Sequence, residues 1–170
     1  VRSLKFRNTI LAYLQVDQTD LFPDQWLYIH DSEVKTGRIT NFRNWVPQLY
    51  GEHRESILCM EYWCNFEDEL WSTDDETLKS LARGEIEKIG LAPGDRILDA
   101  HIFRIPRCYP VYFSGYQEML LPVQEFLDNI NNLHVIGRYG AYKYNNQDHS
   151  ILMGMLAAEN DFSKQKKDNN

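Results

Sequence analysis

Residues 137 to 150, GRYGAYKYNNQDHS, concentrate the side chains of this sequence that are best suited to bind an anion. Arg and Lys attract negative charge, Tyr hydroxyls donate hydrogen bonds, and Gly lets a ligand approach the backbone closely. The segment supplies all three kinds of group, from Gly137, Arg138, Gly140, Tyr142, Lys143 and Tyr144. Its composition therefore favours a site for a phosphate or a partly anionic ring.

The elements on either side of this segment decide how it is presented. Residues 133–136, LHVI, are an apolar run typical of a short buried strand, and residues 150–160 have the composition of a mostly apolar helix. The residues between them then form a strand-to-helix connection, in which three are placed to cap the helix: Asn145, Asn146 and Asp148. The free N–H groups and the dipole at a helix amino end attract negative ligand atoms. The alternative is a loop that only caps the helix, with an arginine that is solvated or paired to a carboxylate.

Composition and charge limit the function classes. The 170 residues are 43% hydrophobic and 13% aromatic, which is enough apolar material for one core. A net charge of −7 and a pI of about 5.2 argue against duplex nucleic acid as a partner, because binding it needs a dominant basic face. No run reaches the roughly 20 apolar residues of a membrane span, and the first residues lack a signal-peptide cleavage site. We therefore predict a soluble cytoplasmic protein without a membrane span.

The cysteines and histidines do not form a recognisable metal or disulfide pattern. Three cysteines are an odd number and lie outside zinc-finger spacing, so they are expected to be thiols: Cys59, Cys64 and Cys108. Four histidines are scattered along the chain without a ligand spacing: His30, His53, His101 and His134. We therefore assign no metal.

The two ends of the sequence suggest a piece of a longer protein. The first residue is not Met, and the last eight residues, 163–170, are rich in charge and amides. Such a composition predicts a disordered tail.

The body of the sequence predicts an α+β fold. Five runs of β-favouring residues are expected to be strands: residues 9–16, 25–30, 37–42, 56–64 and 96–105. The connections between the first four are too short for repeated helical crossovers, which indicates an antiparallel sheet. After the fifth run, the prolines and aromatics of residues 106–116 predict an extended segment that leaves the sheet.

Two helices are expected beside this sheet. Thr73 and Glu76 have capping-box spacing, and an apolar stripe follows them until Gly90: Leu78, Leu81, Ala82, Ile86 and Ile89. Residues 116–130 form a second amphipathic pattern, in which Pro122 is tolerated only near the first turn. The predicted fold is a mostly antiparallel sheet flanked by helices.

Several longer motifs resemble those of a known enzyme family. The C-terminal part carries YPV at residues 109–111 and NLHVIGRYGAYKYNNQDHS at residues 132–150. This combination resembles the signature of UDP-galactopyranose mutase and its FAD-dependent amine-oxidase-like relatives. Upstream, three segments resemble a branch of FAD-dependent or protoporphyrinogen-type oxidoreductases: GRITNFRNW (37–45), ILCMEYWC (57–64) and DELWSTDDETL (68–78).

The resemblance implies one part of a two-domain flavoenzyme. In that family an N-terminal dinucleotide fold binds the ADP part of FAD, and an antiparallel sheet covers the substrate; the G-x-G-x-x-G fingerprint of the first part is absent from this sequence. The implied division is a substrate-binding part at residues 1–132, a strand-loop-helix at 133–162 that completes the flavin site, and the tail at 163–170. FAD is then expected as the cofactor of the full-length enzyme, with this piece inactive by itself.

The resemblance also implies roles for individual residues, while leaving the catalytic residues unassigned. Four residues match positions on the substrate side of the mutases: Arg138 and Tyr144 at the diphosphate, Tyr109, and Arg2 near flavin and diphosphate. Five match positions near the flavin: Gly137, Arg138, Gln147, Asp148 and His149. The substrate is expected to be a small molecule, with a nucleotide-sugar as one candidate. The mutases have YLD where this chain has Tyr144, Asn145 and Asn146, so the sugar chemistry can differ.

Some alternatives stay open at this level. The flavin chemistry of the family is redox in some members and non-redox in others, and a non-catalytic binding or interaction domain that retains the fold is the second hypothesis. The tryptophans can line a substrate or pack in the core: Trp26, Trp45, Trp63 and Trp71. Arg38, Arg43 and Asn44 can face a ligand or solvent from a strand face.

Overall fold

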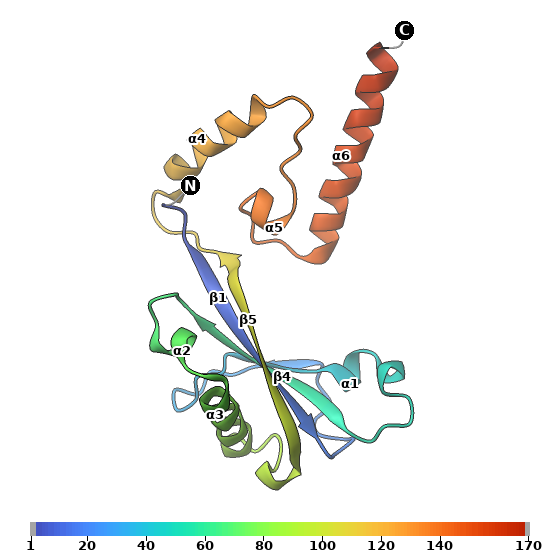
Figure 1. Cartoon of the computed structure of the whole chain (residues 1–170). Coiled ribbons are helices and arrows are strands. Elements are labelled where there is room, and N and C mark those ends of the chain that lie inside the picture. Colours follow the sequence, from blue (N-terminus) through green and yellow to red (C-terminus); the bar gives the residue numbers. More distant parts are fainter. Residues whose placement is uncertain (1–2, 169–170) are drawn as a thin grey trace. The chain divides into compact units, whose positions relative to one another are not determined.

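The computed structural model describes residues 3–168, with side chains placed through residue 162. The chain divides into two compact units (Figure 1). The sheet unit comprises Asn8–Pro106, and the terminal unit combines the residues up to Arg7 with those from Arg107 onward. The boundary between residues 132 and 133 that the sequence suggested lies inside the terminal unit.

The sheet has five strands in the order β2-β3-β4-β1-β5. The strands are β1 (Phe6–Val16), β2 (Trp26–Tyr28), β3 (Arg38–Asn41), β4 (Ser56–Cys64) and β5 (Ile97–Pro110). The pairings β1–β4, β3–β4 and β2–β3 are antiparallel. The predicted α+β fold and the antiparallel arrangement of the first four strands are therefore confirmed.

One face of the sheet carries the core of the sheet unit. Alternate residues of β1 are fully buried, as expected for a strand with one apolar face: Ile10, Ala12, Leu14 and Val16. Helix α3 (Asp75–Lys88) belongs to the same core through the predicted stripe, with Leu78, Ala82 and Ile86 buried. Burial of each large side chain stabilises the fold by roughly 1.5–3 kcal/mol.

The start of α3 differs from the predicted capping box. Thr73 ends the short helix α2 (Glu69–Ser72), because its N–H donates to the carbonyl of Glu69. Asp74 is the N-cap of α3 and accepts a 2.9 Å hydrogen bond from the N–H of Thr77. The prediction of Thr73 as the cap is wrong by one residue: Thr73 is the C-cap of α2, and the side chain that accepts from the first turn of α3 is that of Asp74.

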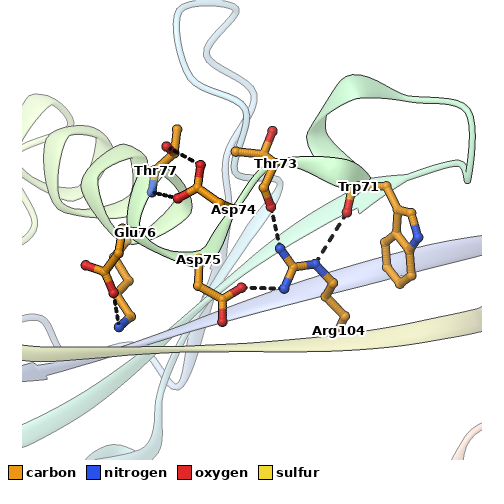
Figure 2. A network of polar contacts seen from close by, with 8 residues as sticks. Trp71, Thr73, Asp74, Asp75, Glu76, Thr77 and Arg104 are labelled. Carbon is orange, nitrogen blue, oxygen red and sulfur yellow. Dashed lines mark hydrogen bonds and ion pairs between the residues drawn. The ribbon is translucent and has the colours of Figure 1, made fainter.

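Arg104 of β5 ties the junction between α2 and α3 to the sheet (Figure 2). Its guanidinium donates to the carbonyls of Trp71 and Thr73 and to the carboxylate of Asp75. One side chain therefore satisfies carbonyls at the end of α2 and a carboxylate in the first turn of α3. This network is structural, because it joins the ends of two helices to a strand of the sheet.

The polar residues of the 37–45 segment are also held by protein groups. Arg38 forms a bidentate pair with Glu61, at 2.7 Å for both contacts. Arg43, in the short helix α1 (Phe42–Trp45), donates to the carbonyls of His53 and Glu55. Asn44 donates to the carbonyls of Phe22 and Asp24. These contacts support a structural role for the three side chains.

Two single-turn 3-10 helices complete the sheet unit, η1 (Pro47–Tyr50) and η2 (Gly94–Arg96). The tryptophans of this unit are distributed over several environments. Trp26 and Trp45 stack with ring centroids 5.2 Å apart and are both exposed, whereas Trp71 meets Phe66 edge to face. Trp63 covers Gly37 so closely that a Cβ there would lie 2.3 Å from the indole. They do not form one continuous wall.

Within residues 3–168, the terminal unit contains three helices: α4 (Tyr116–Asp128), α5 (Gly137–Gly140) and α6 (Gln147–Asp168) (Figure 1). Strand β5 continues to Pro110, so the prediction that the chain leaves the sheet after residue 105 is wrong. Pro122 lies inside α4 and not in its first turn, which also corrects the prediction.

The segment before α5 is not the buried strand that its apolar composition predicted. Residues 133–136 have no strand structure, and Leu133 and Ile136 are exposed. Helix α6 begins three residues earlier than expected and continues through residues 163–168, where the sequence predicted a disordered tail. Residues 169 and 170 of that tail lie outside the described part of the chain.

Helix α6 presents its large apolar side chains outward. The exposed set is Ile151, Leu152, Met155, Leu156 and Phe162. The side chains that are partly buried on the helix are smaller or less apolar on average: Ser150, Met153, Ala157 and Asp161. None of the helices in the described part of the chain is long and apolar enough to cross a bilayer.

Candidate functional site

Arg138 lies in α5 and is the half-buried centre of the candidate site. Its Nε and Nη2 atoms donate to the carbonyl of Asn145, at 3.2 and 2.6 Å. No carboxylate pairs with this guanidinium among the residues that the structure describes, and its Nη1 amine has no acceptor there. The side chain is therefore fixed by the protein while its positive charge remains unneutralised.

Two predicted tyrosines pack against this guanidinium. The Arg138 Cζ atom lies 4.8 Å from the ring centroid of Tyr109 and 5.4 Å from that of Tyr144. The two rings stack on one another with centroids 5.2 Å apart and planes inclined by 24°. Aromatic faces favour a cation, so the three side chains form one cluster and hold the guanidinium in place. The sequence prediction thus named three residues that the fold brings together.

The loop after α5 leads into the first turn of α6. The carbonyl of Asn146 accepts a 3.2 Å hydrogen bond from the N–H of Ser150, so the helical ladder starts at this point. The N–H groups of the three residues before Ser150 have no i−4 carbonyl within the helix. Asn145 does not cap the helix as predicted: its Oδ1 atom is buried without a partner, and its Nδ2 atom donates to the sulfur of Met153.

A cavity of about 540 Å³ lies beside this cluster. Its volume falls in the range of roughly 300–1,000 Å³ that is usual for small-molecule sites. It is lined by Cys108, Arg138, Tyr139, Asn145, Asn146, Gln147, Ser150 and Ile151. Residues on β5, α5, the following loop and the first turn of α6 therefore meet at one hollow within the terminal unit.

The electrostatics of this cavity favour an anion. Arg138 is a cation, and no described residue in the lining is a carboxylate. Burial raises the pKa of Tyr139, and the nearby Cys108 raises it further, so this phenol stays neutral at pH 7 and adds no negative charge. The positive end of the α6 dipole adds to the effect of the guanidinium. The arrangement is suited to a phosphate or another oxyanion.

Of the other residues that the sequence predicted for the site, some lie at the cavity and others do not. Gln147 lines the cavity, and Gly137 begins α5 with φ +77°, a conformation that favours glycine. Asp148 and His149 are exposed and lie against one another at 3.1 Å, outside the lining. Arg2 lies outside the described residues.

The sequence pattern missed several contributors. Cys108 and Tyr139 line the cavity next to the predicted Tyr109 and Arg138, and Ser150 and Ile151 follow Gln147 at helical spacing. Adjacency and the i, i+3, i+4 rule are the signals that identify them. Lys143, in contrast, lines a separate cavity of about 350 Å³ at the start of α4.

The site offers no set of metal ligands. Within the part of the chain that the structure describes, no three His, Cys, Asp or Glu side chains cluster in a way that would hold a metal ion. Cys59, Cys64 and Cys108 form no disulfide in the described part of the chain, and the first two are buried.

The fold is similar to parts of two solved enzymes. The crystal structure of reduced UDP-galactopyranose mutase matches with a TM-score of 0.75 and 24% identity over 88% of this chain and 32% of the mutase chain. A protein from Exiguobacterium sp. 255-15 described as a protoporphyrinogen oxidase matches with a TM-score of 0.57 and 16% identity, over 93% of this chain and 36% of its own. The sequence matches no family model and no curated protein. This chain thus has the fold of a region that spans about a third of the length of each of these two chains.

Proposed function

We propose that this chain is the substrate-side part of a flavin-dependent enzyme and that its Arg138 cavity binds a phosphate-bearing substrate. One observation carries the proposal. A half-buried guanidinium without a carboxylate partner among the described residues lines a cavity at the amino end of a long helix. A guanidinium that is held in place and has no carboxylate partner attracts an anion and can donate to its oxygens.

Each residue of the cluster has a distinct role in this proposal. Arg138 keeps its Nη1 donors for phosphate oxygens while Nε and Nη2 anchor the side chain on Asn145. Tyr144 is exposed beside the guanidinium, and Tyr109 supports both. The first turn of α6 adds N–H donors that no helix carbonyl satisfies.

The same corner fits the electron-rich edge of a flavin. The lining is free of carboxylates among the described residues and includes Gln147 at the start of α6. Gln147 and the backbone N–H groups of the first turn are the groups that would hold FAD, because a helix amino end stabilises negative charge. When bound, the flavin supplies the redox or nucleophilic chemistry of the reaction. The protein side chains bind and orient the substrate beside it.

The structural neighbours support an enzymatic origin. Their names describe a mutase that acts on a UDP-sugar and an oxidase, and this chain spans about a third of each. We infer that the remainder of the enzyme supplies the dinucleotide-binding part. A nucleotide-sugar is the substrate class that the Arg138 cluster fits best, since a diphosphate matches a planar guanidinium fork.

The proposal is tested by titrating the chain with UDP and measuring the affinity by calorimetry. Arg138→Ala should weaken UDP binding by about 10- to 100-fold, because it removes charge-assisted hydrogen bonds. The UDP affinity of Arg138→Lys should fall between those of wild type and Arg138→Ala, since lysine keeps the positive charge but not the planar pair of donors. Arg54→Ala is the matched control, because Arg54 is exposed in the sheet unit and its loss removes the same charge.

The outcomes separate the two hypotheses. Equal affinities of the Arg138→Ala and Arg54→Ala variants would contradict a phosphate site at Arg138. Loss of UDP binding in Arg138→Ala, together with a full-length protein that purifies without visible flavin absorbance, would favour a non-catalytic ligand-binding domain that retains the fold.

A further inference from the structure

Tyr142 lies between the two predicted ligand-binding residues and is itself withdrawn from the cavity. Its side chain is buried, with 2% of the residue exposed, although the loop around it is open. Its φ angle is +49°, in the left-handed region that is unfavourable for a residue with a Cβ. A tyrosine persists in this conformation only when its surroundings compensate for the strain.

The compensation comes from the phenol. Its single hydroxyl proton is shared between two acceptors, the carbonyl oxygens of Lys5 and Val111, at 2.7 and 3.0 Å from the phenol oxygen. These two residues are themselves joined by a 2.9 Å hydrogen bond from the N–H of Val111 to the carbonyl of Lys5. The ring also meets Phe6 edge to face, with centroids 5.2 Å apart. Tyr142 is therefore anchored to the place where β1 begins and β5 has just ended.

A second tyrosine, Tyr112, connects Tyr142 to Tyr144 through its hydroxyl. The hydroxyl of Tyr112 donates to the carbonyl of Tyr142 at 3.4 Å and accepts a 2.7 Å hydrogen bond from the N–H of Tyr144. In the other direction, the N–H of Tyr142 donates to Tyr139 and the N–H of Lys143 donates to Arg138. Both flanks of Tyr142 are thus connected to the residues of the cluster.

We propose that Tyr142 is a positioning residue: its buried phenol, together with Tyr112, holds the loop so that Arg138 and Tyr144 face the ligand together. This inference rests on the proposed function of the Arg138 cavity. In this proposal the hydroxyl of Tyr142 bonds to backbone carbonyls of the protein. The composition of the segment had suggested instead that this hydroxyl donates to the ligand. A loop that is fixed before binding loses less conformational entropy when the ligand binds.

The test compares Tyr142→Phe and Tyr112→Phe with wild type. Each variant keeps its ring and removes one hydroxyl. The amide exchange rate of Tyr144 is measured by NMR on the free chain, and UDP affinity is measured separately. We expect faster exchange at Tyr144 and a loss of UDP affinity of about 3- to 10-fold in both variants, as for the loss of one hydrogen bond. The double variant should lose less than the product of the two effects, because both hydroxyls belong to one chain of contacts.

Tyr50→Phe is the matched control, since the Tyr50 hydroxyl accepts a backbone hydrogen bond from Ile57 in the sheet unit. The melting temperature of Tyr50→Phe should change about as much as those of the other two variants. Its amide exchange rate at Tyr144 and its UDP affinity should stay the same as in wild type. Unchanged exchange at Tyr144 in Tyr142→Phe and Tyr112→Phe would overturn the positioning role. The exchange measurement needs no ligand, so it decides this point even if UDP fails to bind and the proposed function is rejected.

Discussion

At the scale of single residues, the partner of each guanidinium decides what that arginine does. Arg38 is paired with Glu61 and Arg104 with Asp75, so both charges are neutralised within the sheet unit. Arg138 rests on two tyrosine rings and one backbone carbonyl. The three arginines are indistinguishable by type, and the third is the one of these three that no carboxylate pairs with among the described residues.

The cysteines should differ in reactivity in a way that follows from their surroundings. Burial raises the pKa of Cys59 to about 12, and the carboxylate of Glu61 adds to the effect, so this thiol stays protonated at neutral pH. Cys108 is only half-buried and lines the cavity. Iodoacetamide should therefore modify Cys108 first in the folded chain.

Mass spectrometry of peptides after timed alkylation measures this order. Cys59 and Cys64 should react only when urea is added, which serves as the positive control. Modification of Cys59 at the rate of Cys108 in the folded protein would contradict the burial of that thiol.

Asp74 should make the stability of α3 depend on pH. Hydrogen bonds from the N–H and the hydroxyl of Thr77 lower the pKa of this carboxyl below its ordinary value. A lowered pKa means that the stabilising effect is present above the ordinary value of about 4 and is lost as the pH falls through the lowered value.

The melting temperature of wild type should therefore exceed that of Asp74→Asn by an amount that shrinks below about pH 4, since asparagine caps the helix without titrating. Asp74→Ala should melt lower than both above that pH. A difference between wild type and Asp74→Asn that is independent of pH would contradict this assignment.

At this scale the sequence predicted which residues form the cluster, but it did not predict every local contact of the individual side chains. Arg138, Tyr144 and Tyr109 were named through motif resemblance, because their spacing alone does not show that Tyr109 packs on residues near the other end of the unit. The capping residue was misplaced by one position, since Thr and Asp are both good N-cap residues and only the hydrogen bond from Thr77 identifies Asp74.

At the scale of elements, α3 buries its large apolar side chains, whereas α6 exposes them. Ile86 of α3 is fully buried in the core, whereas Ile151 of α6 is 64% exposed. Ile86→Ala should lower the free energy of unfolding by about 2–5 kcal/mol through lost burial and a cavity. Ile151→Ala is the matched control and should change it by less than about 0.5 kcal/mol.

Urea denaturation followed by circular dichroism provides both values. A small effect at Ile86 would mean that α3 is not packed on the sheet as described, and a large effect at Ile151 would mean that α6 is covered in solution.

The elements with periodic patterns were predictable, and those set by tertiary context were not. The strands β1 and β4 follow from their runs of apolar, β-favouring residues, and the stripe of α3 follows from helical spacing. Residues 133–136 looked like a strand because they are apolar, but a strand needs a hydrogen-bonded neighbour, which the sequence does not reveal. The same limit applies to β5. Its prolines indicated that the strand ends at residue 105, so the sequence did not predict that it continues to Pro110.

At the scale of the whole molecule, the proposed function requires a further part of the enzyme to complete the site. It spans about a third of the two enzymes that share its fold. If the flavin is bound mainly by the remaining part, FAD should bind this chain only weakly. A fluorescence titration that gave a stoichiometric, submicromolar FAD complex would contradict this division of the site.

The central claim is that the amino end of α6 and Arg138 together bind a phosphorylated ligand. The most direct measurement is the NMR chemical-shift map of the isotope-labelled chain during titration with UDP, with uridine as the uncharged control. The claim predicts shifts at the amides of Arg138, Gln147 and Asp148 with UDP and much smaller shifts with uridine. Shifts confined to the sheet unit, or none at these three amides, would contradict it.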